Sequence, residues 1–294
     1  MERILVPLDG SALSEAIVPV AEALARDYGA ELVLLRAVRT RIVEALEPEA
    51  KVAGEAEAYL RRIAEEVRAR GLSRVSWSVR FAKPEHAIAE AAARNRVDLI
   101  TMTTHGRGGL SRLLLGSVAE SLVRQAPAPV LLVRGQPSWL AGKITRILVP
   151  LDLSELSAEI LGIVEALAGP LDLAIVLLHA VEPIDRTATA EAAARLEEIT
   201  ELRRADADTY LAKVAQDLQG KGLRARHLVR TGAALDVIQE SARDEGIDLI
   251  AMTTHGRTGL GRLFFGSVAE RVLRAAPVPV LLLKARENGG MSHA

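Results

Sequence analysis

The chain has 294 residues, 49% of them hydrophobic, and its 37 basic and 38 acidic side chains leave a formal net charge of −1. This composition excludes a disordered chain, and the balanced charge with three Phe, three Tyr and two Trp argues against a nucleic-acid partner. The lack of cysteine excludes disulfides, thiolate nucleophiles and cysteine zinc sites.

No apolar run approaches the roughly 18 to 20 residues that a membrane span needs, so no membrane association is predicted. The first residues, Met-Glu-Arg-Ile-Leu-Val-Pro, lead directly into an apolar run and lack the basic and small-residue features of a signal peptide. We therefore expect a cytoplasmic protein.

In the first half of the chain, short apolar runs alternate with amphipathic stretches in which apolar residues recur every three or four positions. Strands are predicted at residues 4–8, 31–38, 75–81, 99–103 and 130–133, and helices at 11–28, 48–70, 84–95 and 117–125. Strict alternation of strand and helix predicts an α/β fold, an open parallel five-stranded sheet of Rossmann-like type with helices on both faces.

The second half repeats the first. Residues 3–9 recur unchanged at 146–152, an offset of 143, whereas residues 97–107 recur with small changes at 247–257, an offset of 150. The second copy therefore holds seven extra residues, which we expect near 186–219. Two tandem domains are predicted, 1–140 and 141–294, with the last residues, 287–294, as a frayed tail.

A ligand of such a sheet binds beyond the carboxyl ends of the strands, where the strand order reverses. Asp9 follows the first predicted strand, and residues 102–106, Met-Thr-Thr-His-Gly, span the end of the fourth. We expect these two segments to meet at that edge.

A glycine-rich pattern follows the fourth strand of each copy. Gly106 is followed by nine residues and then by Gly116 and Ser117, which open a helix whose free amides and dipole suit a phosphate. The loop also carries cations. The corresponding residues are Arg107 and Arg112 in the first copy, and Gly256, Arg257, Arg262, Gly266 and Ser267 in the second.

The serines have an alternative interpretation that needs no ligand. Ser117 with Glu120, and Ser267 with Glu270, fit the S-x-x-E capping box of a helix N-terminus. The motif alone leaves both interpretations open.

The strand-end aspartate, the Thr-His-Gly-Arg segment, the nine-residue gap, Gly-Ser-Val-Ala-Glu and the Ala-Pro-Ala-Pro-Val-Leu-Leu-Val segment together resemble the universal stress protein family. The resemblance covers nearly the whole chain, twice. The family's nucleotide-binding branch has the signature Gly, two residues, Gly, nine residues, Gly, then Ser or Thr. Thr103 and Thr253 replace its first glycine, where a side chain could crowd a phosphate or donate a hydrogen bond to it.

The resemblance implies an ATP-binding module of the stress response, with Mg²⁺ as a possible companion of the nucleotide. Asp9 and Asp152 would contact ribose or adenine, and Val118 and Val268 would each give a backbone amide to phosphate. The adenine pockets would be lined by Pro7, Ala37 and Met102 in the first copy and by Pro150, Ala180 and Met252 in the second.

Catalysis is not expected. His105 and His255 lie beside the glycines, but no serine or acid stands in a relation to them that would make a triad. A single aspartate per copy is weak support for a metal site. Slow ATP hydrolysis or autophosphorylation remains compatible with the sequence, as does a nucleotide-free interaction scaffold of the same family.

The last strand of each copy, 130–133 and 280–283, is an apolar sheet edge of the kind that soluble proteins cover. In the resembled family such strands pair in a dimer. This implies an intramolecular pseudo-dimer of the two copies, and a homodimer of chains is a further possibility.

Overall fold

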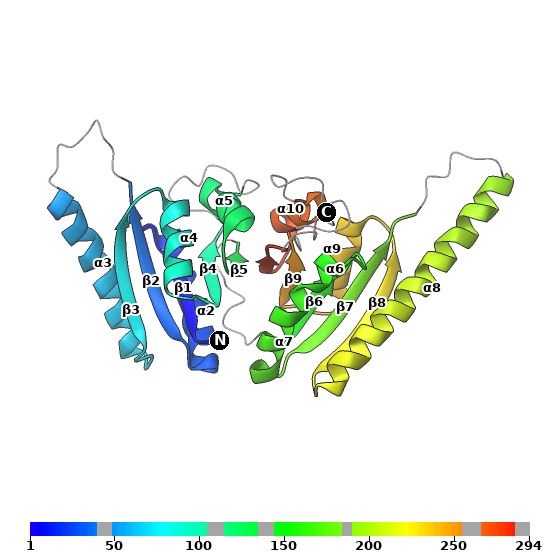
Figure 1. Ribbon diagram of the computed structural model, residues 1–294, viewed down its shortest axis with the longest axis horizontal. Coiled ribbons are helices and arrows are strands. Elements are labelled where there is room, and N and C mark those ends of the chain that lie inside the picture. The colour runs from blue at the N-terminus through cyan, green and yellow to red at the C-terminus, as the bar shows by residue number, and fades with distance from the viewer. Residues whose placement is uncertain (40–48, 105–114, 135–143, 184–189, 255–265, 286–294) are drawn as a thin grey trace, which may run out of the picture. The chain divides into compact units, whose positions relative to one another are not determined.

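The computed structural model describes residues 1–39, 49–104, 115–134, 144–183, 190–254 and 266–285. Contacts divide the chain into two compact units, Met1–Lys143 with Pro279–Leu282, and Ile144–Val278 with Leu283–Ala294. Each unit contains a parallel sheet between helices, as predicted (Figure 1). The domain boundary near residue 140, which was inferred from the sequence repeat, stays a prediction.

The described part of the first repeat contains the five expected strands in the expected order, with five helices where four were expected. Its elements are β1 (Arg3–Pro7), α1 (Ala12–Glu15), α2 (Val18–Tyr28), β2 (Glu31–Val38), α3 (Glu49–Ala69), β3 (Val75–Phe81), α4 (Pro84–Arg94), β4 (Leu99–Thr103), α5 (Ser117–Gln125) and β5 (Val130–Val133).

The second repeat follows the same plan. Its elements are β6 (Arg146–Pro150), α6 (Glu155–Ala158), α7 (Ile160–Leu171), β7 (Ala174–Val181), α8 (Ala190–Gly220), β8 (Arg224–Thr231), α9 (Ala234–Asp244), β9 (Leu249–Thr253), α10 (Ser267–Ala275) and β10 (Val280–Leu283).

The strand order in the first repeat is β3-β2-β1-β4-β5, and all four pairings are parallel. The order reverses between β1 and β4, because β2 and β3 lie on one side of β1 and β4 and β5 on the other. In the second repeat, β9-β6-β7-β8 has the same parallel arrangement. Within the first unit, residues 280–282 pair antiparallel with β5 on its outer side, which covers that edge.

The core lies on the central strands. Ile4, Leu5 and Val6 of β1 are fully buried, as are Ile147 and Leu148 of β6. Consecutive residues are buried because helices cover both faces of a parallel sheet. Neither face of the strand is exposed to solvent, so neither needs polar residues. No helix in the described part of the chain is both long and apolar enough for a membrane span.

The helix expected over 11–28 is two helices, and this expectation was wrong. The chain leaves helical pairing at Ala16 and Ile17, before α2 begins with Val18 and Pro19. Pro19 has no N–H to donate to the carbonyl of Glu15, and its ring crowds that turn. The second repeat also breaks, at Glu159, without a proline nearby.

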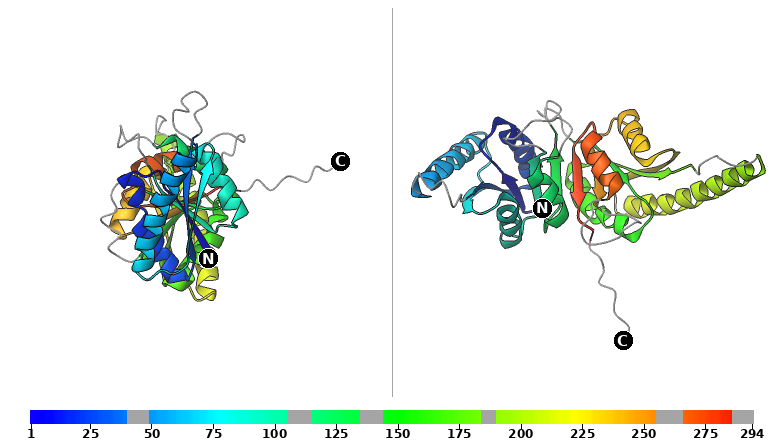
Figure 2. Two further views of the ribbon diagram at one scale, coloured as in Figure 1. Left: turned by 90° about the vertical axis from the view of Figure 1, so that its left-hand side faces the viewer. Right: turned by 90° about the horizontal axis from the view of Figure 1, so that it is seen from above.

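The extra residues of the second repeat lengthen α8. Strand β7 retains the offset of 143 from β2, and the pairing Ile175↔Ala225 corresponds to Leu32↔Val75 at an offset of 150. The insertion therefore lies between β7 and β8, where α8 has 31 residues against 21 in α3. Figures 1 and 2 show α8 extending past the strands of its own sheet.

Candidate functional site

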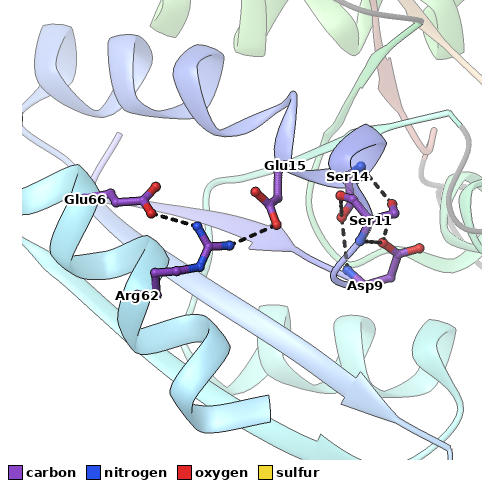
Figure 3. A network of polar contacts seen from close by, with 6 residues as sticks. All are labelled: Asp9, Ser11, Ser14, Glu15, Arg62 and Glu66. Carbon is purple, nitrogen blue, oxygen red and sulfur yellow. Dashed lines mark hydrogen bonds and ion pairs between the residues drawn. The ribbon is translucent and has the colours of Figure 1, made fainter. Parts of the chain in front are cut away.

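Asp9 lies in a closed turn directly after β1 (Figure 3). Its Oδ1 accepts hydrogen bonds from the Ser11 backbone N–H, at 2.9 Å, and from the Ser11 hydroxyl, at 2.6 Å. Ser11 is also the N-cap of α1 and accepts from the Ser14 N–H at 3.1 Å. Aspartate commonly bonds the backbone two residues ahead in this way, so the carboxylate is held at the carboxyl edge of the sheet.

The second repeat reproduces this turn. Oδ1 of Asp152 accepts from the Ser154 N–H at 3.0 Å and from its hydroxyl at 2.5 Å, and Ser154 caps α6. Sequence reasoning selected the two aspartates but missed the serines. The Asp-x-Ser spacing followed by a helix would have been the signal for them.

The N-terminus of α5 is attached to the end of β4 by its own backbone. The Gly116 N–H donates to the Thr104 carbonyl at 2.9 Å, and Gly116 is the N-cap, with no side-chain cap among the described residues. The next N–H groups, on Ser117 and Val118, belong to the first turn of the helix, which leaves them without an intrahelical acceptor. Ser117 is exposed and Val118 half-buried, so solvent reaches this N-terminus.

The capping-box interpretation of the serines was wrong in both repeats. Gly266 occupies the N-cap of α10, and its N–H donates to Thr254 at 2.8 Å. Ser117 and Ser267 therefore stand one position inside their helices, where they cannot cap. Glu120 and Glu270 instead pair with arginines one turn later, at 2.9 and 2.7 Å.

The carboxylate and the helix N-terminus lie at the same edge of the sheet. β1 and β4 are hydrogen-bonded neighbours, with Ile4 opposite Leu99, so Asp9 and the Thr104–Gly116 contact both follow their carboxyl ends. The strand order reverses between these two strands, and such a reversal opens a crevice. The structure thus brings Asp9 and residues 102–104, the described part of the second predicted segment, to the same edge of the sheet, as expected.

The predicted adenine-lining residues lie at the carboxyl ends of neighbouring strands. Pro7, Ala37 and Met102 are half-buried, as are Pro150 and Ala180, whereas Met252 is buried, at 7% exposure. Thr103 and Thr253 are buried at 4% and 6% exposure, so little of either side chain adds to the accessible surface there. The nucleotide contacts assigned to all of these residues stay predictions.

Several predicted residues lie outside the described part of the chain. These are His105, Gly106, Arg107 and Arg112 of the first repeat and His255, Gly256, Arg257 and Arg262 of the second.

The two repeats differ beside the aspartate. Gly10 has φ +81°, and a Cβ there would overlap Nη1 of Arg36. The Arg36 guanidinium lies 4.8 Å from the centre of the Tyr59 ring on α3, a cation–π distance. The first site therefore has an arginine packed against its aspartate turn, a residue that sequence reasoning missed.

The second repeat replaces both partners. Leu153 stands where the first has Gly10 and keeps a positive φ of 66°. His179 stands in place of Arg36, and its Nδ1 donates to the Leu151 carbonyl at 2.7 Å. The imidazole is shorter than the arginine side chain and leaves room for the leucine. The Asp9 and Asp152 turns therefore have similar backbones but different side chains beside them.

An ion-pair network joins α1 to α3 beside the Asp9 turn (Figure 3). Arg62 contacts Glu66 at 2.7 Å and Glu15 at 3.2 Å, and the hydrogen bond to Glu66 is the main reason that the pKa of Arg62 is raised. Burial, followed by the charge of Glu15, raises the pKa of Tyr59. Arg62 thereby links α1, the helix that follows the Asp9 turn, to α3.

No three His, Asp or Glu side chains gather as a metal site would require, within the ranges that the structure describes.

Comparison with known proteins identifies the same family for both repeats. The model of the universal stress protein family matches residues 1–134 and 143–284. A universal stress protein of Thermus aquaticus is 38% identical over 143 residues, 45% of this chain and 98% of that protein. Universal stress protein Rv2005c of Mycobacterium tuberculosis is 28% identical over 215 residues, covering 69% of this chain and 67% of that protein.

The fold also has a solved counterpart of similar length. The crystal structure of a universal stress protein from Archaeoglobus fulgidus covers 97% of this chain and 97% of its own, with a TM-score of 0.71 and 21% identity. At that identity the similarity shows the shared fold.

Proposed function

Because the chain belongs to the universal stress protein family, we propose that each of its two domains binds ATP and that the protein is a regulatory module of the stress response. One observation carries this proposal: each repeat joins a helix N-terminus capped only by glycine to a carboxylate at the same sheet edge. The amides would hold the polyphosphate, and the carboxylates of Asp9 and Asp152 would bond the ribose hydroxyls.

The helix N-terminus of the proposed site suits an anion, and the carboxylate suits a neutral hydrogen-bond donor such as a hydroxyl. The positive end of a helix dipole favours a phosphate by about 0.3–1 kcal/mol, and each hydrogen bond to a charged group contributes about 1.5–3 kcal/mol. The half-buried Pro7, Ala37 and Met102 offer apolar surface for a base. The site residues outside the described ranges, Gly106 and Gly256, would let the backbone approach the phosphates.

Calorimetric titration with Mg-ATP tests the proposal, and we expect two nucleotides per chain. Gly116→Val should remove one of them and Gly116→Val with Gly266→Val should remove both, because the branched side chain shields the amides. Gly116 has φ −63°, which valine accepts, so the substitution does not strain the backbone. We expect at least tenfold weaker binding at a changed site, about 1.4 kcal/mol.

The control is Gly54→Val on α3, where an added Cβ meets nothing within 4 Å; it should bind like the wild type. An unchanged protein that gives no heat, and from which no nucleotide can be extracted after purification, would mean that the proposal is wrong.

The alternative function is a nucleotide-free scaffold, which Thr103 and Thr253 favour because they replace a signature glycine. It predicts that Gly116→Val with Gly266→Val leaves the cellular phenotype intact, whereas the ATP proposal predicts its loss. We also propose that the protein is not an enzyme. ATP turnover above about 1 s⁻¹, the lower end of the range for dedicated enzymes, would contradict this.

A further inference from the structure

The N-terminal part of α8 has no buried side chain over a length of about 18 Å, at 1.5 Å per residue. Ala207, Leu211, Ala215 and Leu218 are buried against their own sheet, but no side chain in 195–206 is buried. Figures 1 and 2 show this end of α8 running beyond its sheet. The inserted residues have therefore extended the helix into solvent.

Two large apolar side chains are exposed on this extension. Ile199 and Leu202 are 41% and 61% exposed, and Phe81 is the other large hydrophobic residue of this kind in the described ranges. Ile199 and Leu202 are three positions apart, so they share a face. At about 100° per residue, that face is turned roughly 130° from the stripe that Ala207, Leu211 and Leu218 bury.

Charges of opposite sign bracket the apolar pair on the same face. Arg195, Ile199, Leu202 and Asp206 follow one another at spacings of four, three and four, which is the seam of a helix pair. All four are exposed. The order is the same read from either end: a charge, two aliphatic residues, then a charge of the opposite sign.

This order fits a second helix of the same sequence running in the opposite direction. A two-fold axis between residues 200 and 201 would place Ile199 of one chain opposite Leu202 of the other, and Arg195 opposite Asp206, each contact occurring twice. A parallel pairing would instead oppose arginine to arginine and aspartate to aspartate. The charges therefore select the antiparallel arrangement.

The residues beside the seam introduce no conflict. In an antiparallel pair the same edge of each helix meets, so Glu198 comes near Ala205 of the other chain and Arg203 near Leu196. No like charges face each other at these positions. The stems of the long side chains can cover the aliphatic residues while their charged ends remain in water.

We propose that the 195–206 face of α8 docks a second copy of this chain, as an antiparallel helix pair with two-fold symmetry. The contact is far shorter than an interface that buries the usual 1,200–2,000 Å². The association is therefore weak and concentration-dependent, a reversible pairing of chains through their second domains. It does not depend on the proposed nucleotide sites.

Sedimentation velocity over a concentration series of the full chain tests the pairing. Arg195→Asp opposes aspartate to Asp206 twice, and Asp206→Arg opposes arginine to Arg195 twice, so each should weaken association at least tenfold. The double variant Arg195→Asp/Asp206→Arg restores both opposite-charge contacts and should associate like the wild type. An equal mixture of the two single variants should form mixed pairs for the same reason.

Arg61→Asp, an exposed position on α3, is the control and should leave association unchanged. The proposal is overturned if the wild type shows no self-association up to about 1 mM, or if the single variants associate as it does. It is also overturned if the double variant and the mixture stay as weak as the single variants.

The chain has no native cysteine, so the thiol of Leu202→Cys can be labelled selectively. Its labelling rate shows what covers the 195–206 face of α8. Its maleimide labelling should be fast in dilute protein and slow as concentration rises. Slow labelling that is independent of concentration would show that a segment of the same chain covers this face, contrary to the proposal.

Discussion

At the scale of single residues, the Gly10–Arg36 contact gives a direct test of how the first aspartate turn is built. Gly10→Ala should destabilise the protein by about 2 kcal/mol, because L-residues disfavour φ +81° and the new methyl displaces the guanidinium from Tyr59. In an Arg36→Ala background the cost should fall to about 1 kcal/mol, that of the backbone alone. Urea denaturation of the four proteins measures this coupling, and additive costs would contradict the contact.

Glu31 gives a prediction that depends on pH. The Ser76 hydroxyl donates to its Oε1 at 2.6 Å, and this bond is the main reason that the pKa of Glu31 is lowered, with Arg3 assisting at 3.3 Å. A pKa lowered by folding contributes stability that is present above about pH 4.3, the unfolded value, and is lost as pH falls through the folded pKa.

Ser76→Ala should therefore cost about 1 kcal/mol at pH 7, and the difference from wild type should narrow as the pH falls below about 4. Urea denaturation at pH 7 and pH 3 measures both. Ser78→Ala on the same strand is the control. A cost that is equal at the two pH values would show that the hydrogen bond does not act through the carboxylate.

At the scale of elements, one glutamate per repeat joins the second helix to the end of the long helix. Glu22, 6% exposed in its side chain, contacts Arg26 at 2.7 Å and Arg70 at 2.8 Å. Its counterpart Glu165 is 29% exposed and contacts Lys221 at 2.7 Å. The same connection is buried in one domain and more open to water in the other.

Glu22→Gln should destabilise by about 2–3 kcal/mol, because two guanidinium groups would lose the charge of a buried partner. Glu165→Gln should cost about 1 kcal/mol or less, because water screens its pair. Thermal denaturation of the two variants compares them directly. Equal costs would mean that burial does not set the strength of this connection.

The helices and strands show how far local sequence reaches. Strands such as β2 and β5 were predicted at their observed bounds, because Val, Ile and Leu runs between turn residues admit few other structures. Pro19 carried the signal for the break before α2, but nothing local marks the similar break at Glu159. A break set by packing against the rest of the domain cannot be found in a short window.

The candidate site was predicted in its location and less well in its details. Alternating strands and helices predict a parallel sheet, so Asp9 and the end of the fourth strand could be placed at its carboxyl edge from the sequence. The structure adds that β1 and β4 are hydrogen-bonded neighbours. The bounds of α5 were predicted correctly, but the capping box that Ser117 and Glu120 fit in sequence is not what begins this helix. Gly116 is the N-cap, and its N–H donates to the carbonyl of Thr104, twelve residues earlier. Arg36 was missed because its contact with Gly10 links two different strand ends.

At the scale of the whole molecule, the two repeats share the same strands and aspartate turns but differ in the side chains around those turns. The segment 3–9 recurs without change at 146–152, and both aspartate turns have the same hydrogen bonds. Gly10 and Arg36 of the first repeat correspond to Leu153 and His179 of the second, and the half-buried Met102 corresponds to the buried Met252. The insertion lengthened one helix only. The repeats thus diverged around the site while the turns that build it stayed the same.

The glycine caps of α5 and α10 have a consequence for how such proteins change over generations. A surface made of main-chain N–H groups is supplied by every amino acid except proline, provided that the chain follows the same path and no branched side chain at the cap shields the amides. Selection then acts on the backbone conformation more than on the identity of each amino acid. Related proteins can therefore differ widely in sequence and still keep the same backbone surface at these helix N-termini.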